Sequence, residues 1–178
     1  TQNYVIDMIN NNKALRELAL RVNLGTGEVN LDLNSFKVPS TLKKVKVCFA
    51  PCPHKHLKEV EEMMVILSSA VTLEHLILEF HPLPSLTSIA LIGKLINLEK
   101  LEISFYQSPA DNVLGTLGET ISSLRNLKSF SILLTDKTIA FHTDVMELVS
   151  YLEDLESLEV LQMTIRNIDI NNRTIEKM

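Results

Sequence analysis

The residues of this sequence that most directly suggest chemistry are two cysteines and two histidines that fall within nine positions. They are Cys48, Cys52, His54 and His56, and thiolate and imidazole are the usual ligands of structural zinc. Most such sites combine two separated pairs of ligands, whereas here all four would have to converge within one short segment stiffened by Pro51 and Pro53. We therefore expect a solvated loop with no metal and no cofactor, and keep a zinc site as the alternative.

Common motifs of catalytic centres are absent from the sequence. Gly25-Thr26-Gly27 lacks the Gly-Lys-Ser/Thr tripeptide of a P-loop, and neither H-E-x-x-H nor G-x-S-x-G occurs. The acidic residues are mostly scattered over segments with a helical pattern, where they are typical of a solvated surface. We expect this protein not to be an enzyme.

Composition excludes several other classes. The chain has 178 residues with 46% hydrophobic residues, which argues against disorder, and its net charge of −5 argues against a nucleic-acid binder. No apolar run reaches the ~18 residues that span a bilayer, and the first residues do not resemble a signal peptide. Two cysteines are too few for a disulfide framework. We expect an intracellular, cytoplasmic protein with reduced thiols and no membrane span.

A repeated phrase dominates the sequence: an apolar residue, two others, an apolar residue, one other, and an apolar residue. Its six copies are Leu15-Leu18-Leu20, Leu42-Val45-Val47, Leu73-Leu76-Leu78, Leu98-Leu101-Ile103, Leu127-Phe130-Ile132 and Leu158-Leu161-Met163. Their first residues are separated by 27, 31, 25, 29 and 31 positions. Self-similarity at this period is the signature of a stack of repeating units.

Each copy predicts a short strand, because apolar and other residues alternate within it. Helical stripes lie between most copies and predict helices near 57–67, 86–96, 113–124 and 145–155. The segment before the second copy alternates like an extended chain, so we expect an irregular unit there. Six positions before each copy stands an apolar residue that should pack on the strand of its own unit: Ile9, Phe36, Leu67, Ile92, Ile121 and Leu152. Strands joined through helices predict a parallel sheet that curves, with helices on its convex side.

The phrase resembles the leucine-rich repeat, whose core reads L-x-x-L-x-L, and the unit length with its intervening helix is similar to the ribonuclease-inhibitor-like subclass. The resemblance runs from about Tyr4 to Ile168 and implies an α/β solenoid of about six repeats. One feature departs from the family, which usually places Asn or Cys three residues after the third apolar position. The residues found there are Asn23, Ala50, His81, Tyr106, Thr135 and Arg166, and only Asn23 fits. We therefore expect variable loops after the strands.

We expect residues 1–178 to form a single leucine-rich-repeat domain, taken from a larger repeat array or protein. The tail from Ile168 to Met178 looks like the start of a further unit, and the alternative is that it folds back as a cap. A solenoid exposes a core face at each end unless something covers it. We expect further repeats or another subunit to cover the ends.

The alternation also predicts which strand residues face the concave side of the sheet. The candidate partner-binding residues on that side are Arg21, Lys44, Lys46, His75, Ile77, Glu79, Lys100, Glu102 and Leu133. Lys44, Lys46 and Lys100 suggest a basic stripe, whereas the last two units are neutral and partly apolar. The resemblance implies a protein-interaction module of an adaptor, sensor or ubiquitin-ligase substrate receptor. The alternative is a structural subunit buried in a larger multi-protein assembly.

Overall fold

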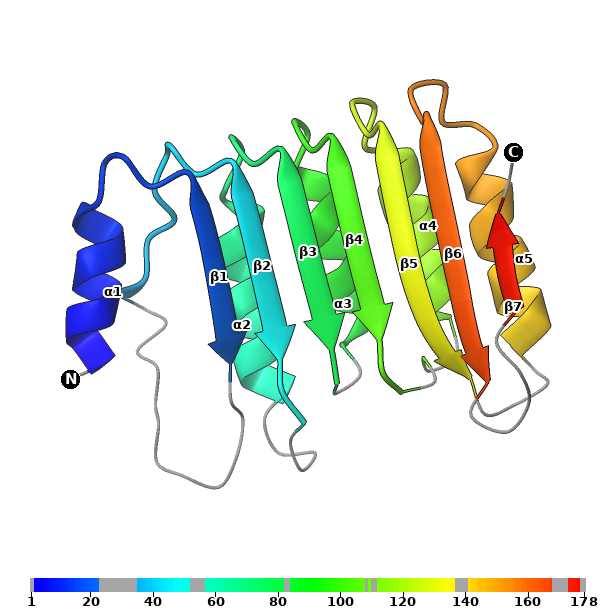
Figure 1. Ribbon diagram of the computed structural model, residues 1–178, viewed down its shortest axis with the longest axis horizontal. Helices are drawn as coiled ribbons and strands as arrows, with labels where there is room; N and C mark the ends of the chain where they lie inside the picture. The colour runs from blue at the N-terminus through cyan, green and yellow to red at the C-terminus, as the bar shows by residue number, and fades with distance from the viewer. Residues whose placement is uncertain are drawn as a thin grey trace.

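The computed structural model describes residues 2–22, 35–51, 57–81, 84–107, 109, 112–136, 141–167 and 173–176. Its described strands form one sheet whose order follows the sequence (Figure 1). The strands are β1 (Glu17–Val22), β2 (Lys44–Phe49), β3 (His75–Phe80), β4 (Lys100–Phe105), β5 (Ser129–Asp136), β6 (Val160–Asn167) and β7 (Arg173–Glu176). The first six are parallel, and β7 runs antiparallel to β6. The expected α/β architecture with six parallel strands is confirmed.

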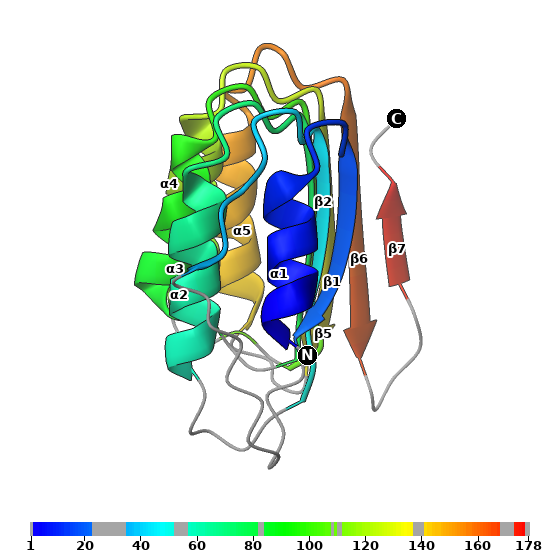
Figure 2. The same ribbon diagram turned by 90° about the vertical axis from the view of Figure 1, so that its left-hand side faces the viewer.

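Helices alternate with these strands. They are α1 (Gln2–Asn11), α2 (Leu57–Ser68), α3 (Leu86–Ala90), the 3-10 helix η2 (Leu91–Lys94), α4 (Val113–Ser122) and α5 (Phe141–Leu152). Helices α2 to α5 lie on one side of the sheet, and α1 lies beyond β1 at one end of the row of strands (Figures 1 and 2). In the described ranges, no helix lies on the other side of the sheet (Figure 2).

Two predicted connections differ from regular helices. The helix predicted near 86–96 is a five-residue α-helix followed by a 3-10 turn, and its first residue, Leu86, is 41% exposed. This unit has the shortest spacing, from Leu73 to Leu98, so less chain is available to cross from β3 to β4. Residues 35–43 contain no α-helix, as expected for the irregular second unit.

The core consists of rows of apolar side chains that run across the strands. The second and third positions of the phrase align in register, and from β2 to β5 they are at most 1% exposed. A further apolar row, which the six-residue phrase did not include, lies two positions later: Val22, Phe49, Phe80, Phe105, Leu134 and Ile165. The rings of Phe49 and Phe80 stack at 5.2 Å between centroids, and those of Phe80 and Phe105 at 5.6 Å. The stacked rings therefore join neighbouring units in the core at the C-terminal ends of β2, β3 and β4.

The turn that leads into each strand is also repeated. The apolar residues six positions before the phrase are all buried, as predicted. Just after the first leucine of each unit, one carbonyl accepts hydrogen bonds from two successive amides of the next unit. The carbonyl of Glu74, for example, accepts from Glu99 at 2.8 Å and from Lys100 at 2.9 Å. The same arrangement recurs at Arg16, Lys43, Glu99 and Lys128, so all six units share one geometry.

The end of the chain supports the alternative that we kept for the tail. Within the described residues 173–176, the backbone pairs antiparallel with β6, from Arg173 opposite Ile165 to Glu176 opposite Gln162. A further repeat would instead contribute a parallel strand. This segment therefore occupies the edge of β6 rather than beginning a seventh unit.

Candidate functional site

The candidate site is the side of the sheet that α2 to α5 leave uncovered, which we call the open face. Its side chains form three rows, because each of the six parallel strands contributes three alternate residues at equivalent register positions. They are Glu17, Ala19 and Arg21; Lys44, Lys46 and Cys48; His75, Ile77 and Glu79; Lys100, Glu102 and Ser104; Ser129, Ser131 and Leu133; and Val160, Gln162 and Thr164. All eighteen are half-buried or exposed.

All nine predicted partner-binding residues lie on the open face. The structure brings them together from five neighbouring strands, as the alternation predicted: Arg21, Lys44, Lys46, His75, Ile77, Glu79, Lys100, Glu102 and Leu133. Their common placement is a geometric result, and binding through them remains a prediction.

The lysines of the open face do not form a bare basic stripe. Lys44 lies 3.3 Å from Glu17, Lys46 lies 2.6 Å from Glu79, and Lys100 lies 2.9 Å from Glu102. The glutamates that pair with Lys44 and Lys46 lie on neighbouring strands, and Glu102 lies on the same strand as Lys100. The charged part of the face, from β1 to β4, is a mixed network of cations and anions.

Glu79 is the centre of one part of this network. Burial alone would raise the pKa of this carboxyl, but hydrogen bonds from Lys46 and Cys48 outweigh burial and hold the pKa below its ordinary value. The same hydrogen bond to Glu79 raises the pKa of Lys46. Burial, together with the hydrogen bond to Glu79, raises the pKa of the Cys48 thiol. Cys48 is therefore a neutral thiol rather than an activated nucleophile.

Glu102 is the centre of the other part. Its Oε1 atom lies 3.0 Å from Nε2 of His75 and 2.9 Å from Nζ of Lys100. Burial raises the pKa of Glu102, but these two hydrogen bonds outweigh it and lower the pKa overall. For His75, burial lowers the pKa and outweighs the opposing hydrogen bond to Glu102. The two glutamates thus remain charged while each holds two neighbours in place.

The rest of the open face, on β5 and β6, carries no charge. It consists of three hydroxyl side chains, one amide and two apolar side chains: Ser129, Ser131, Thr164, Gln162, Leu133 and Val160. Val160 is 53% exposed, which is high for a branched apolar side chain. The face therefore has a charged half and a neutral half that meet at β4.

A pair of stacked aromatic rings adjoins the open face, and this contact was not predicted from the sequence. The rings of His81 and Tyr106, which directly follow β3 and β4, stack with 4.3 Å between their centroids. Both residues stand eight positions after the first leucine of their units, where the resemblance predicted Asn or Cys. Comparing residues at equal offsets in successive units would have placed the two rings side by side.

The structure describes only one of the four candidate zinc ligands. Cys48 lies on the open face beside Glu79, as a half-buried free thiol. Cys52, His54 and His56 lie outside the described residues. Within the described part of the chain, no group of three or more His, Cys, Asp or Glu side chains could hold a metal ion.

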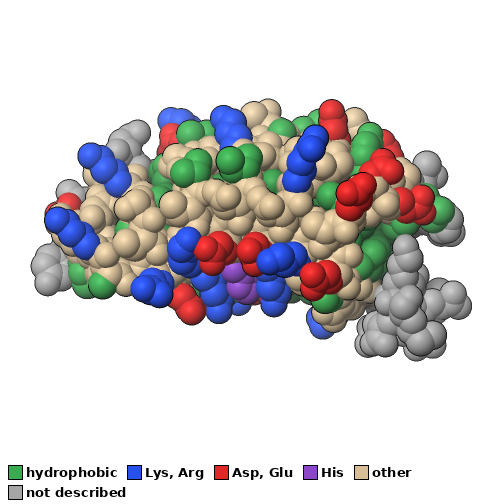
Figure 3. Space-filling model, turned by 90° about the horizontal axis from the view of Figure 1, so that it is seen from above, with side chains coloured by type: hydrophobic (Ala, Val, Ile, Leu, Met, Phe, Trp, Pro, Cys, Tyr) green, Lys and Arg blue, Asp and Glu red, His purple; other side chains and the backbone are tan. Residues whose placement is uncertain are grey.

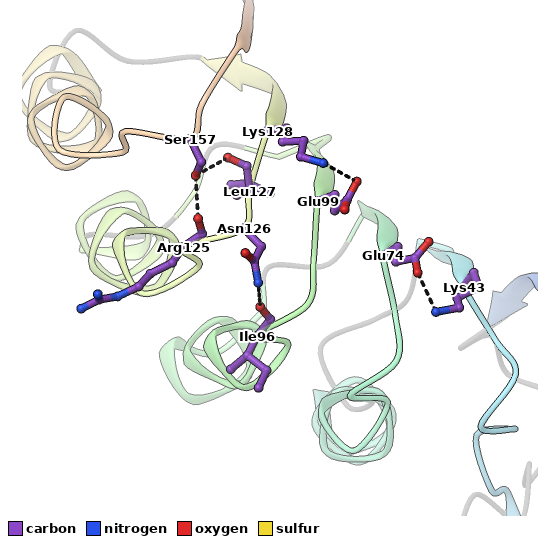
Figure 4. Close-up of polar contacts among 9 residues, drawn as sticks. All are labelled: Lys43, Glu74, Ile96, Glu99, Arg125, Asn126, Leu127, Lys128 and Ser157. Carbon is purple, nitrogen blue, oxygen red and sulfur yellow. Dashed lines mark hydrogen bonds and ion pairs between the residues drawn. The ribbon is translucent and has the colours of Figure 1, made fainter.

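Polar side chains join the units along the rim where the strands begin (Figure 4). Asn97 donates a hydrogen bond to the carbonyl of Val71 at 2.7 Å, and Asn126 donates to that of Ile96 at 2.9 Å. Thr41, Thr72 and Ser157 stand at the same position before the first leucine and also donate to the preceding unit. These bonds fix the spacing of the units and hence of the rows on the open face.

Comparison with known proteins does not assign the chain to a family. No protein-family model matches the chain, and no curated protein matches it. Among the described residues, no helix has the length and apolar character needed to cross a membrane.

Proposed function

We propose that this chain is a non-catalytic protein-interaction module whose partner docks on the open face. The observation that carries the proposal is that a six-stranded parallel sheet leaves one entire side uncovered by the described helices. Parallel sheets usually have both sides covered. A side that the described helices leave uncovered, with eighteen half-buried or exposed side chains, is thus a surface suited to a second macromolecule.

The repeat geometry supports a leucine-rich-repeat type of solenoid. The phrase recurs in register on six strands, and a helix of each regular unit packs behind the sheet. At the position where this family places Asn or Cys, the third and fourth units carry the stacked rings of His81 and Tyr106. One residue earlier, the stacked rings of Phe49, Phe80 and Phe105 lie in the core. We propose a divergent member of that class.

The two halves of the open face suggest different contributions to binding. The glutamate-centred pairs are partly exposed, so each contributes little to folding stability. They present a fixed pattern of charges that selects a complementary partner and orients it. Leu133 and Val160 in the neutral half offer apolar area that a partner can remove from water.

Charge reversal on the open face tests the proposal. The full chain is used as bait with wild-type sequence, with Lys44→Glu and Lys46→Glu together, and with Lys58→Glu and Lys94→Glu together. The last pair is a matched control, since it changes the net charge equally but lies on the exposed helical side. We expect proteins recovered by the wild type to drop by about tenfold or more with the open-face variant, equivalent to about 1.4 kcal/mol, and to persist with the control.

Circular dichroism and the melting temperature show whether each variant is folded. Equal recovery of the same proteins by wild type and both folded variants would reject the open face as the docking surface.

A second candidate function is that of a structural subunit in a larger assembly. Leu158 and Leu161 of the last unit are only half-buried, whereas the equivalent residues from Leu42 and Val45 to Leu127 and Phe130 are fully buried. Such an end gains stability when another subunit covers it. A purified chain that stays soluble and monomeric favours the interaction module, and one that requires a partner to stay in solution favours the structural subunit.

A further inference from the structure

The row of the open face nearest the start of the strands holds three basic side chains on neighbouring strands. Lys44 of β2 is in register with His75 of β3, which is in register with Lys100 of β4. We call these three residues the basic triplet. Neighbouring strands lie about 4.8 Å apart, so the triplet is about 10 Å long. In the other two rows of these described strands, no two neighbouring strands both carry a basic side chain.

Among the described residues, two carboxylates serve the three basic side chains of the triplet. Lys44 pairs with Glu17 at 3.3 Å, the longest of the three lysine–glutamate distances on the open face, and the Glu17 side chain is 71% exposed. Glu102 uses one oxygen, Oε1, for both His75 at 3.0 Å and Lys100 at 2.9 Å. Because exposed ion pairs contribute little free energy, a second carboxylate can replace Glu17 at Lys44.

The glutamates on the rim beside the triplet are paired with other lysines. Glu74 and Glu99 stand directly before two members of the triplet in the sequence. Glu74 pairs with Lys43 at 2.6 Å, and Glu99 pairs with Lys128 at 3.1 Å. Seen from above this rim, a His side chain lies among Lys or Arg side chains, next to Asp or Glu side chains (Figure 3). The rim carboxylates therefore do not supply the missing partner of the triplet.

His75 is the member of the triplet whose charge changes between neutral and mildly acid pH. A carboxylate oxygen accepts hydrogen bonds and cannot donate one, so Nε2 of the neutral ring carries the proton in the contact with Glu102. The other ring nitrogen, Nδ1, then has a lone pair and cannot donate to a second carboxylate. A carboxylate placed beside the ring therefore favours the doubly protonated form, in which both nitrogens donate.

The strands on either side of β3 determine the charge around this ring. Lys44 and Lys100 flank it directly, whereas Lys46 of β2 and Glu79 of β3 pair with each other at 2.6 Å. Burial and the charges of the two flanking lysines lower the pKa of His75 and outweigh the contact with the neighbouring glutamate of β4. The ring of the free chain is thus largely neutral at neutral pH, and an added carboxylate opposes the effect of the lysines.

We propose that the partner of the open face places a carboxylate group on the basic triplet, so that its capture strengthens as the ring of His75 gains a proton. This inference rests on the proposed function and names the chemistry of the partner, which is a protein segment rich in Asp or Glu. The carboxylate replaces Glu17 at Lys44 and accepts from the second nitrogen of the protonated ring. Binding then raises the pKa of His75, so affinity is greatest below the pKa of the free chain and falls as the pH rises through the pKa of the complex.

Fluorescence anisotropy of a labelled hexaglutamate peptide tests the proposal on the full chain. Binding is measured at about pH 7.5 and about pH 5.5, where glutamate side chains with an ordinary pKa near 4.3 stay mostly ionised. Glu79 and Glu102 also stay ionised, because their pKa values lie below 4.5. We expect about fivefold tighter binding at the lower pH, which is most of the tenfold effect of a pKa that rises by about 1 on binding.

Two histidine variants identify the group that responds to pH. His75→Gln keeps a donor for Glu102 but has no ring to titrate, so its affinity for hexaglutamate should be the same at both pH values. His81→Gln is the matched control, because His81 adjoins the open face but lies outside the triplet. It should keep the pH dependence of the wild type. Circular dichroism at both pH values shows that each variant is folded.

Two lysine variants identify the surface. Lys44→Gln with Lys100→Gln removes two charges of the triplet and should weaken binding of hexaglutamate by about tenfold or more at both pH values. Lys58→Gln with Lys94→Gln changes the net charge equally on the helical side, and should bind like the wild type.

The proposal is overturned if hexaglutamate does not bind, if it binds no more tightly than hexaglutamine, or if folded His75→Gln keeps the pH dependence of the wild type. Equal weakening by both pairs of lysine variants overturns it as well. These outcomes leave the open face as the docking surface when Lys44→Glu with Lys46→Glu still reduces protein capture. Unchanged capture by that variant rejects the docking surface itself, so the two failures are distinguishable.

Discussion

Two glutamates, Glu79 and Glu102, organise the charged half of the open face. Each accepts hydrogen bonds from two side chains, so that Lys46 and Cys48 are held at one and His75 and Lys100 at the other. A lysine on its own loses considerable side-chain entropy when a partner immobilises it. Because these side chains are already held in place, a partner that matches their pattern loses less of its binding free energy to ordering.

Acidification is expected to lower the stability of the fold in two separate ranges. The folded-state pKa of His75 lies below 6.5, so the unfolded chain takes up the proton first and stability decreases as the pH falls below that value. The folded-state pKa values of Glu79 and Glu102 lie below 4.5, so stability decreases again as the pH falls below 4.5 and through those values. Denaturant midpoints, measured at a series of pH values from neutral to acid, report both decreases in stability.

His75→Gln is the control for this pH dependence. It should reduce the loss that begins near 6.5 and leave the loss below 4.5 in place. If the stability profiles of the variant and the wild type are parallel throughout, the assignment of the first step to His75 is wrong.

Among the elements, α4 and α5 pack closely because two glycines of α4 face α5. A Cβ atom at Gly118 would lie 2.5 Å from Cδ2 and 3.1 Å from Cβ of Tyr151, whereas one at Gly115 would meet the carboxylate of Glu147 at 2.8 Å. The base of the Tyr151 side chain cannot move away without shifting α5. The carboxylate of Glu147 is the end of a flexible, exposed side chain and can move.

The two glycines should therefore respond differently to substitution by alanine. We expect Gly118→Ala to lower the free energy of unfolding by about 1–3 kcal/mol, as overpacking does. Gly115→Ala should change it little or raise it by up to about 1 kcal/mol, since alanine favours the helix. Urea unfolding of the two variants measures the difference, and equal losses at both positions would contradict the close approach of Tyr151 to Gly118.

Periodicity in the sequence predicted those elements that depend on spacing alone. The strands β1 to β6 and helices α2, α4 and α5 follow from apolar residues at regular offsets. Most of the segment that we predicted to be irregular, before β2, lies outside the described residues. The predicted helix over 86–96 was only partly right, because tertiary geometry in the shortest unit favours a 3-10 turn at Leu91–Lys94.

For the molecule as a whole, alternation predicted which side chains share the open face but not how they pair. The pairing of Lys46 with Glu79 and of His75 with Glu102 depends on rotamers and on register between strands, which one strand's sequence does not contain. The antiparallel pairing of Arg173–Glu176 with β6 likewise depends on competition between a folded-back segment and a further unit. The stack could be predicted because it depends on the spacing of apolar residues along the chain. The ion pairs of the open face and the position of β7 could not, because they depend on contacts between residues far apart in the sequence.

The proposed function requires a protein partner that covers the open face of the sheet. Lysine modification with an amine-reactive ester, followed by mass spectrometry, tests this with the chain free and bound to a protein that it recovers. We predict that binding protects Lys44, Lys46 and Lys100 on the open face while Lys58 and Lys94 on the helical side react as before. Protection of Lys58 and Lys94, with unchanged reaction at Lys44, Lys46 and Lys100, would show that the partner binds the helical side and not the open face.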